Sequence, residues 1–93
     1  MEKTRFSPED VIVIRSGFRF QWEPAQERHV LLYPEGMVKL TMSAGEILKR
    51  CDGEHTVSAI IDELKQQFPD VDLEADVYKF LEVADENGWI ETR

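Results

Sequence analysis

From Phe18 to Glu23, aromatic and polar residues alternate one by one along the chain. A period of two is that of a β-strand with one packed face and one solvated face. Pro24 cannot donate a ladder hydrogen bond and is expected to end this strand. The runs Arg28–Tyr33 and Met37–Leu40 are rich in β-branched, aromatic and large apolar residues, and they predict two further strands. Together the three runs predict an antiparallel sheet with Arg28–Tyr33 in its centre.

A tight turn is predicted between the last two of these strands, at Pro34-Glu35-Gly36. Pro34 presets φ for the first central position of a turn, and Gly36 fits the position after it. The segment that follows, Met37–Thr41, is the last strand of the sheet and is expected to be an edge. The sequence leaves open which side of this strand is free, and whether the N-terminal residues or another strand cover it.

Residues 1–17 are expected to form an N-terminal arm ahead of a single domain that spans residues 18–93. Within the arm, Val11–Ile14 is a short β-prone run closed by Ser16-Gly17. It fits a further strand, or an arm that lies against the body or against a second copy of the chain. The run is too short for its periodicity to decide between these alternatives.

The hydrophobic period changes to that of a helix after Thr41. Ser43 and Glu46 fit a capping box, in which both side chains satisfy free N–H groups at the start of a helix. Asp52-Gly53 is expected to end this helix. Thr56 is expected to cap a second helix, whose apolar residues all fall on one face. These residues are Val57, Ile60, Ile61, Leu64 and Phe68, and Pro69 ends the helix.

A third helix is predicted after Asp72, which can cap it, and Gly88 is expected to stop it. Trp89-Ile90 is then expected to pack back on the body. Three strands followed by three helices predict a small α+β domain, with the helices covering one face of the sheet. Two helices joined by a short turn beside a β-hairpin is also the layout of a winged helix. The apolar positions of the third helix are Leu73, Val77, Phe80, Leu81 and Ala84.

Composition places the chain among ordinary soluble proteins, with 42% hydrophobic and 32% charged residues. No apolar run approaches the roughly 20 residues that span a bilayer. The first ten residues lack the apolar segment of a signal peptide. The single Cys51 fits a reducing compartment, because it has no partner for an intramolecular disulfide. We therefore expect a cytoplasmic protein that does not bind a membrane.

Charge argues against nucleic acid as a partner. The net charge is −8, and residues 70–93 hold eight acidic and two basic residues. The helix that would enter a DNA groove, Leu73 to Asn87, carries Lys79 as its one basic residue. Phosphate contacts supply much of the affinity in such complexes, and this helix would oppose them.

The sequence contains no pattern typical of a catalytic or metal site. Cys51, His29 and His55 lack the spacing of a metal-binding motif, so no metal is expected. Ser43 and Ser58 are explained more simply as a helix cap and a helix surface residue than as nucleophiles. The glycines are scattered singly and form no phosphate-binding loop. We expect neither enzymatic activity nor a bound cofactor.

Protein recognition fits the remaining features. A short edge strand at Met37–Thr41 can accept an extended peptide as an added strand, with main-chain bonds for affinity and side-chain pockets for specificity. An acidic third helix beside such a groove would favour basic residues on the partner.

The run LLYPEGMVKLTMSAGEILKRCDGEHTVSAIIDEL, Leu31 to Leu64, resembles the PqqD family of pyrroloquinoline quinone biosynthesis. The resemblance rests on the strand-turn-strand at Pro34-Glu35-Gly36, on Ile47-Leu48, and on Cys51-Asp52-Gly53 followed by Thr56-Val57. It continues through Asp76-Val77, Phe80-Leu81 and Gly88-Trp89-Ile90, and covers about residues 18–91.

The resemblance implies a non-catalytic peptide chaperone, a RiPP recognition element of winged-helix type. Members of the family bind the precursor peptide PqqA and present it to the radical S-adenosylmethionine enzyme PqqE. Related domains hold the peptide beside the third strand, in a groove closed by the third helix. This implies a peptide site at Met37, Val38, Lys39, Leu40, Thr41, Val77, Tyr78, Leu81 and Asp85.

Two other functions are alternatives. One is a self-associating module that pairs copies through Val11–Ile14 or through the edge strand. The other, ranked last because nothing in the sequence builds a site for it, is a small enzyme or quinone-binding protein of the same pathway. Both a monomer and a homodimer fit the sequence.

Overall fold

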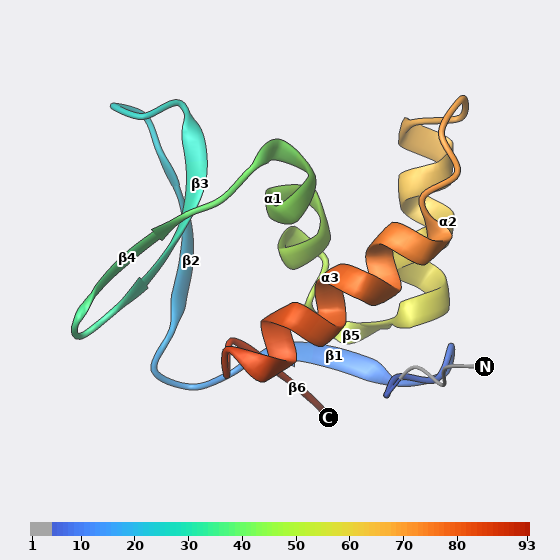
Figure 1. The fold of residues 1–93 in the computed structure, drawn as a ribbon, viewed down its shortest axis with the longest axis horizontal. Coiled ribbons are helices and arrows are strands. Elements are labelled where there is room, and N and C mark those ends of the chain that lie inside the picture. The colour runs from blue at the N-terminus through green and yellow to red at the C-terminus, as the bar shows by residue number, and fades with distance from the viewer. Residues whose placement is uncertain (1–4) are drawn as a thin grey trace.

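Four strands precede the first helix in the computed structural model, which describes residues 5–93 (Figure 1). The described strands form two antiparallel sheets of three strands each, in the orders β2-β3-β4 and β5-β1-β6. The predicted α+β class is confirmed, but the second sheet was not predicted. The strands are β1 (Val11–Ile14), β2 (Arg19–Glu23), β3 (Arg28–Tyr33), β4 (Gly36–Lys39), β5 (Asp52–Thr56) and β6 (Ile90–Thr92). The helices are α1 (Met42–Lys49), α2 (Val57–Gln67) and α3 (Glu74–Glu86).

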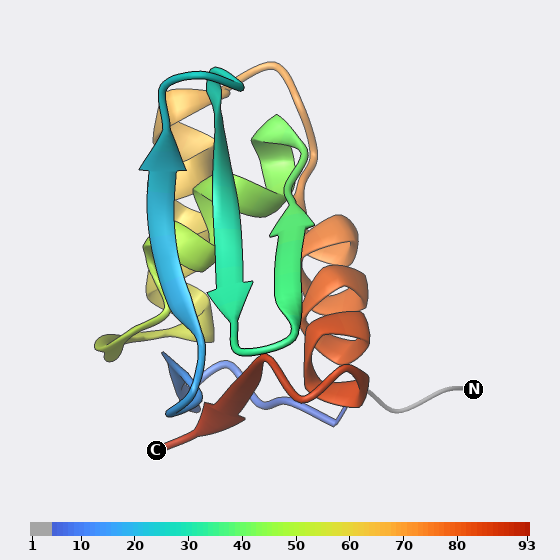
Figure 2. The same ribbon diagram turned by 90° about the vertical axis from the view of Figure 1, so that its left-hand side faces the viewer.

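The sheet β2-β3-β4 is the predicted meander, with β3 in its centre (Figure 2). Its register pairs Leu31 with Phe20 on one side and with Val38 on the other. These three side chains therefore share the face that packs on the core. The predicted turn is confirmed, since Tyr33 pairs with Gly36. Gly36 is the fourth residue of this turn, so the two central positions belong to the residues between the pair.

The second sheet includes part of the expected N-terminal arm. β1 lies between β5 and β6, and Ile12 is fully buried. Of the alternatives left open for Val11–Ile14, the structure shows the further strand, so the fold includes residues before 18; residues 1–4 lie outside the described chain. Since both edges of β1 are paired within the chain, pairing of Val11–Ile14 with a second copy would require the sheet to open.

Asp52-Gly53 belongs to β5 instead of ending the first helix. Asp52 pairs with Val13 of β1, and Gly53 adopts a φ of +83° that favours glycine. The Arg93 guanidinium donates to the Gly53 carbonyl at 2.8 Å. The segment Asp-Gly-Glu-His-Thr has low strand propensity, so it is a strand because β1 pairs with it.

The helix starts differ from the prediction in two of three cases. Thr41 caps α1 instead of Ser43, and its hydroxyl accepts from the Ala44 N–H at 3.1 Å. Thr56 caps α2 as predicted. The N-cap position of α3 is Leu73, which makes no side-chain cap, one residue after the predicted Asp72; the Asp72 carboxylate accepts from the Glu74 N–H at 3.4 Å. Gly88, with a φ of +77°, confirms the predicted end of α3.

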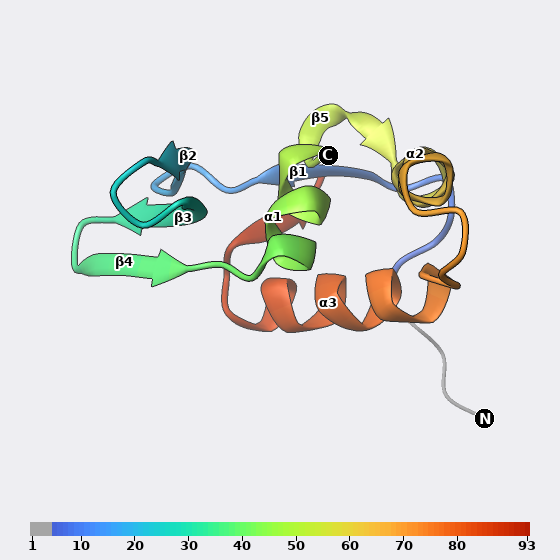
Figure 3. The same ribbon diagram turned by 90° about the horizontal axis from the view of Figure 1, so that it is seen from above.

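The core lies where the two sheets and the three helices meet. Viewed from above, α1 lies between the meander and α2, with α3 alongside (Figure 3). α1 approaches β3 closely at Gly45, where an added Cβ would lie 2.8 Å from Nδ1 of His29. No helix within residues 5–93 has the length and apolar character to cross a bilayer. The largest fully buried side chains include Ile12, Leu31, Leu48, Ile60, Leu64, Leu81 and Ile90.

Candidate functional site

The outer edge of β4 presents main-chain groups that β3 does not use. The Leu40 N–H donates to the His29 carbonyl at 3.1 Å, which fixes one hydrogen-bonded pair of the β3–β4 ladder. In an antiparallel ladder such pairs alternate with non-bonded pairs. Val38, opposite Leu31, therefore directs its N–H and C=O toward β3. Met37 and Lys39 direct theirs away from the sheet.

Nothing in the described chain pairs with this edge, because β4 is the last strand of its sheet. The sequence left open which side of the strand was free, and the register answers that question. The side chains add to the accessibility of the edge: Met37 is 39% exposed, and Lys39 is exposed and forms no ion pair with any residue from 5 to 93. Thr41 lies just beyond β4, with its hydroxyl engaged in the α1 cap.

Helix α3 runs from the α2 side of the molecule toward β4, with its C-terminal end the nearer (Figures 1 and 3), and its two flanks have different neighbours. One flank is covered by the start of the described chain. Arg5 binds Asp85 at 2.8 Å and Glu86 at 2.6 Å, and its N–H donates to Glu82 at 3.3 Å. Phe6, which follows, is buried in the core. This flank is therefore occupied within the chain itself.

The predicted α3 residues lie on this occupied flank or in the core. Asp85 binds Arg5, and the pKa of Tyr78 is raised by burial and then by the charges of Glu74, Glu9 and Asp10. Val77 and Leu81 are 1% and 0% exposed. Leu40, predicted at the strand end, is also buried. Of the predicted site, Met37, Lys39 and Thr41 are exposed; contact of a peptide with any of the nine residues stays a prediction.

The opposite flank of α3 borders a pocket of about 260 Å³ that sequence reasoning missed. Asp76 and Phe80 line it from α3, and Met42 lines it from the first turn of α1. Helical spacing places Asp76 and Phe80 on one side, four residues apart. That signal was present in the sequence, but the apolar period alone did not separate the pocket side of α3 from the core side.

Comparison with known proteins assigns the family. The model of the family "Coenzyme PQQ synthesis protein D (PqqD)" matches residues 28–90, which is more than half of the chain. The chain belongs to the PqqD family. A protein of Azotobacter vinelandii named "PqqA binding protein" is 58% identical over 83 residues, 88% of this chain and 90% of that protein. One of the same name from Acinetobacter baumannii is 50% identical over 92 residues, 98% of each chain.

A solved structure of the PqqD family is similar over almost the whole chain. It is the solution NMR structure of the PqqD truncation of PqqCD from Methylobacterium extorquens, described as a functional, stand-alone RiPP recognition element. The TM-score is 0.77 at 34% sequence identity, with 98% of this chain and 99% of that chain covered. The resemblance expected from Leu31–Leu64 is thereby confirmed.

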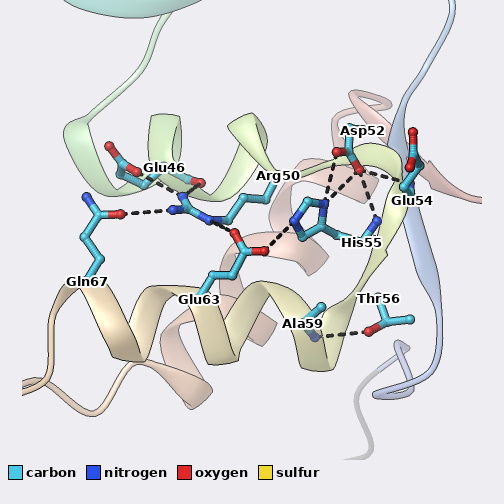
Figure 4. A network of polar contacts seen from close by, with 9 residues as sticks. All are labelled: Glu46, Arg50, Asp52, Glu54, His55, Thr56, Ala59, Glu63 and Gln67. Atoms are coloured by element: carbon cyan, nitrogen blue, oxygen red, sulfur yellow. Dashed lines mark hydrogen bonds and ion pairs between the residues drawn. The ribbon is translucent and has the colours of Figure 1, made fainter.

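A polar network joins α1, β5 and α2 of this PqqD fold (Figure 4). Arg50 binds Glu46 and Glu63, each at 2.9 Å. His55 lies between two carboxylates, with Nδ1 3.0 Å from Asp52 and Nε2 2.7 Å from Glu63. These contacts raise the pKa of His55, the hydrogen bond with Asp52 most. Burial alone would raise the pKa of Asp52, but bonds from His55 and from the Glu54 and His55 N–H groups lower it to about 2.

The network stabilises the PqqD fold and contains no nucleophile that its histidine could activate. The nearby Cys51 is buried, and its thiol donates to the Ile47 carbonyl at 3.4 Å. Burial first, and then the charge of Asp52, raise the pKa of this thiol to about 12. A thiol in that state is a poor nucleophile and a poor metal ligand at neutral pH. Within residues 5–93 no three His, Cys, Asp or Glu side chains gather as a metal site would require.

Proposed function

We propose that this protein is a non-catalytic peptide chaperone of pyrroloquinoline quinone biosynthesis. It binds a PqqA-type precursor peptide as an added strand on the outer edge of β4 and presents it to the radical S-adenosylmethionine enzyme PqqE. The observation that carries the proposal is the pair of residues Met37 and Lys39, whose main-chain groups face away from β3. An extended peptide can satisfy all four of these groups.

Strand addition is supported by how little the edge must change. β4 is held in register by the turn at Tyr33–Gly36 and by its pairing with β3, so the edge is ordered before the peptide arrives. Its accessible side chains, Met37 and Lys39, offer one apolar and one cationic contact. The net charge of −8 favours a peptide with basic residues at the acidic helix surface.

The non-catalytic role and the PqqE partner are supported by different observations. Two of the titratable groups with shifted pKa values, His55 and Asp52, both lie in β5 and are engaged with each other instead of facing β4. Relatives named as PqqA-binding proteins and a relative described as a recognition element are consistent with a carrier of the peptide. A carrier must hand its cargo to a modifying enzyme, and PqqE is the enzyme that the family resemblance implies.

The edge can be tested by removing a single N–H that faces away from the sheet. Lys39→Pro deletes the outward N–H, and proline is tolerated at such an edge position. Lys39→Ala is the matched control, because it removes the charge but keeps the N–H. Isothermal titration with the precursor peptide, with and without PqqE, should give at least about tenfold weaker binding for Lys39→Pro than for Lys39→Ala.

The proposal fails if both variants bind the peptide equally while circular dichroism shows both folded. Labelled protein adds a second measure, since peptide binding should shift the amides of Met37 and Lys39 more than those of β2. Shifts confined to β2 and β3 would place the peptide elsewhere.

Self-association through β4 is the second candidate, and the same unpaired groups favour it. Two copies can pair their β4 edges in an antiparallel arrangement. Sedimentation at increasing concentration separates the two functions: a monomer that binds peptide excludes self-association as the role of this edge. Pairing between copies that the peptide does not disrupt would favour it.

A further inference from the structure

The pocket beside α3 lies where the three helices meet. Its walls come from α1, from the end of α2, from the loop after it and from the first half of α3. Met42 and Val71 stand at its rim, 76% and 51% exposed. Two such large exposed apolar side chains around an apolar cavity are unusual for a surface that only water contacts. The apolar walls are Ile47, Leu64, Phe68, Leu73, Val77 and Phe80.

The pocket continues the line of β4. β4 ends at Lys39, and Met42, three residues later, already lines the pocket. Figure 2 shows β4 running toward the first turn of α1. A peptide that is paired along the outer edge of β4 and continues in the same direction therefore reaches the pocket within a few residues, since an extended chain advances about 3.3 Å per residue.

The charges at the pocket favour a cation beside the bound side chain. Two carboxylates line it, and no Lys or Arg does. Glu46 is already engaged by Arg50 at 2.9 Å. Asp76 is exposed, and its side chain forms no hydrogen bond or ion pair with the rest of residues 5–93. Asp76 is thus the carboxylate at this rim that is available to a partner.

We propose that this pocket is a second subsite for the peptide bound at β4, and that it takes one large apolar side chain followed or preceded by a basic residue. This inference rests on the proposed function and adds a specificity element to it. Met42 and Val71 cover the inserted side chain, and Asp76 pairs with the basic neighbour. Met37 and Lys39 hold the peptide backbone, while the pocket selects which stretch of the peptide is held.

The volume supports an occupant of this size. A dry cavity of about 150 Å³ is large enough for benzene, and this pocket offers about 260 Å³. A leucine, phenylalanine or tyrosine side chain fits without the pocket having to expand. Burying such a side chain is expected to tighten binding about tenfold to a hundredfold.

The first test places a charge at the pocket rim. Val71→Asp should weaken binding of the precursor peptide at least about tenfold in isothermal titration, because a carboxylate at the rim disfavours an apolar side chain. Ala75→Asp is the matched control: it adds the same charge four residues away, at an exposed site in the first turn of α3 that does not line the pocket. It should leave affinity within about twofold.

The second test concerns Asp76. Asp76→Asn keeps the shape but removes the charge, so it should weaken binding about twofold to fivefold and reduce its dependence on salt. Glu74→Gln removes the same charge from the same helical turn outside the pocket. It should change neither affinity nor salt dependence by as much.

The third test uses the peptide and the pocket methyl groups. Alanine replacement along the precursor peptide should find one apolar residue, outside the β4-paired segment, whose loss weakens binding to the wild type but not to Val71→Asp. The methyl signals of Met42 and Val71 should shift on titration. Circular dichroism must show each variant folded.

The outcomes separate this inference from the proposed function. If the peptide shifts Met37 and Lys39 but leaves the methyl groups of Met42 and Val71 unmoved, and Val71→Asp binds like Ala75→Asp, the β4 site stands and the subsite is wrong. If the wild type does not bind the peptide at all, both proposals are wrong.

Discussion

β1 and β4 are strands of four residues with opposite surroundings. β1 lies between two strands, so both of its edges are hydrogen-bonded within the chain, and Ile12 is fully buried. β4 ends its sheet, with Met37 39% exposed and one edge that no strand of residues 5–93 pairs with. The difference is one of topology more than of propensity, because both segments contain β-branched or large apolar residues. A strand paired on both edges stabilises the fold, whereas a strand with a free edge is available to bind.

A free edge also carries a risk, since it can pair with other copies of the chain. β4 limits that risk by being short and by carrying Lys39, two features that natural proteins use at exposed edges. β1 carries no charged residue and is entirely apolar, and both of its edges are already paired. The segment VIVI would be an aggregation hazard if it lay at an edge. The fold therefore pairs β1, the more aggregation-prone of the two strands, on both edges and leaves the less aggregation-prone β4 at the edge of a sheet.

The largest effect is expected from truncating the buried strand. Ile12→Ala should lower the free energy of unfolding by about 2–5 kcal/mol, because it leaves a cavity at a fully buried site. Met37→Ala on β4 should lower it by about 0.5 kcal/mol or less, as surface substitutions commonly do. Urea unfolding followed by circular dichroism measures both. Equal losses would contradict the contrast between a structural and a binding strand.

The next effect distinguishes the two sides of β4. Val38→Pro removes the N–H that faces β3 and leaves the Leu31 carbonyl without its donor, at an expected cost of about 2–3 kcal/mol in the free energy of unfolding. Lys39→Pro, on the outward side, should cost less than about 1 kcal/mol. Thermal or urea unfolding measures the difference.

Binding should follow the reverse order. For as long as Val38→Pro stays folded, it should bind the peptide nearly as tightly as the wild type does. Lys39→Pro should bind the peptide more weakly. If Lys39→Pro were the less stable of the two variants, the register would have been assigned to the wrong side of the strand.

The elements of the fold differ in how far the sequence could predict them. The period of two from Phe18 to Glu23 and the turn after Tyr33 were sufficient for the meander. The apolar period and Thr56 were sufficient for α2. β5 could not be predicted, because the polar segment Asp52–Thr56 becomes a strand only through its pairing with distant β1. Local pattern thus predicts elements that are stable by their own amphipathicity and misses those that depend on a partner.

The candidate site was predictable to the same extent. The edge at Met37–Thr41 followed from the order of the strands, but its free side depends on which residues pair across the turn. The apolar period identified Val77 and Leu81, which are core residues of α3. It could not tell the flank bound by Arg5 from the flank at the pocket, because that depends on where the N-terminal residues pack.

A smaller effect is expected from pH, and it should act on the side of β1 rather than on β4. The pKa of Asp52 is lowered from 3.8 to about 2, so its contribution is present above pH 3.8 and lost as pH falls toward 2. The pKa of His55 is raised from 6.5, so its contribution is present below pH 6.5 and lost as pH rises through the folded-state value.

The stability advantage of the wild type over His55→Gln should therefore be greatest between about pH 4 and pH 6.5. It should decrease on both sides of that range. Melting temperatures of both proteins from pH 3 to pH 9 measure it, and a difference that does not vary with pH would contradict the network. The affinity for peptide of the two proteins should stay equal at pH 7, because β4 contributes no residue to the network.

The smallest effect is expected at Arg5, and it decides which flank of α3 the peptide uses. Arg5 is exposed, so Arg5→Gln should alter stability little although it breaks the pairs with Asp85 and Glu86. If the peptide uses the flank of Asp76, its affinity should change no more than for Arg15→Gln, a matched loss of an exposed pair with Glu91. If it used the flank of Tyr78 and Asp85 instead, Arg5 would compete with its basic residues, and Arg5→Gln would bind several times more tightly than Arg15→Gln. Titrating both variants with the precursor peptide at low salt gives the answer, because exposed charges are least screened there.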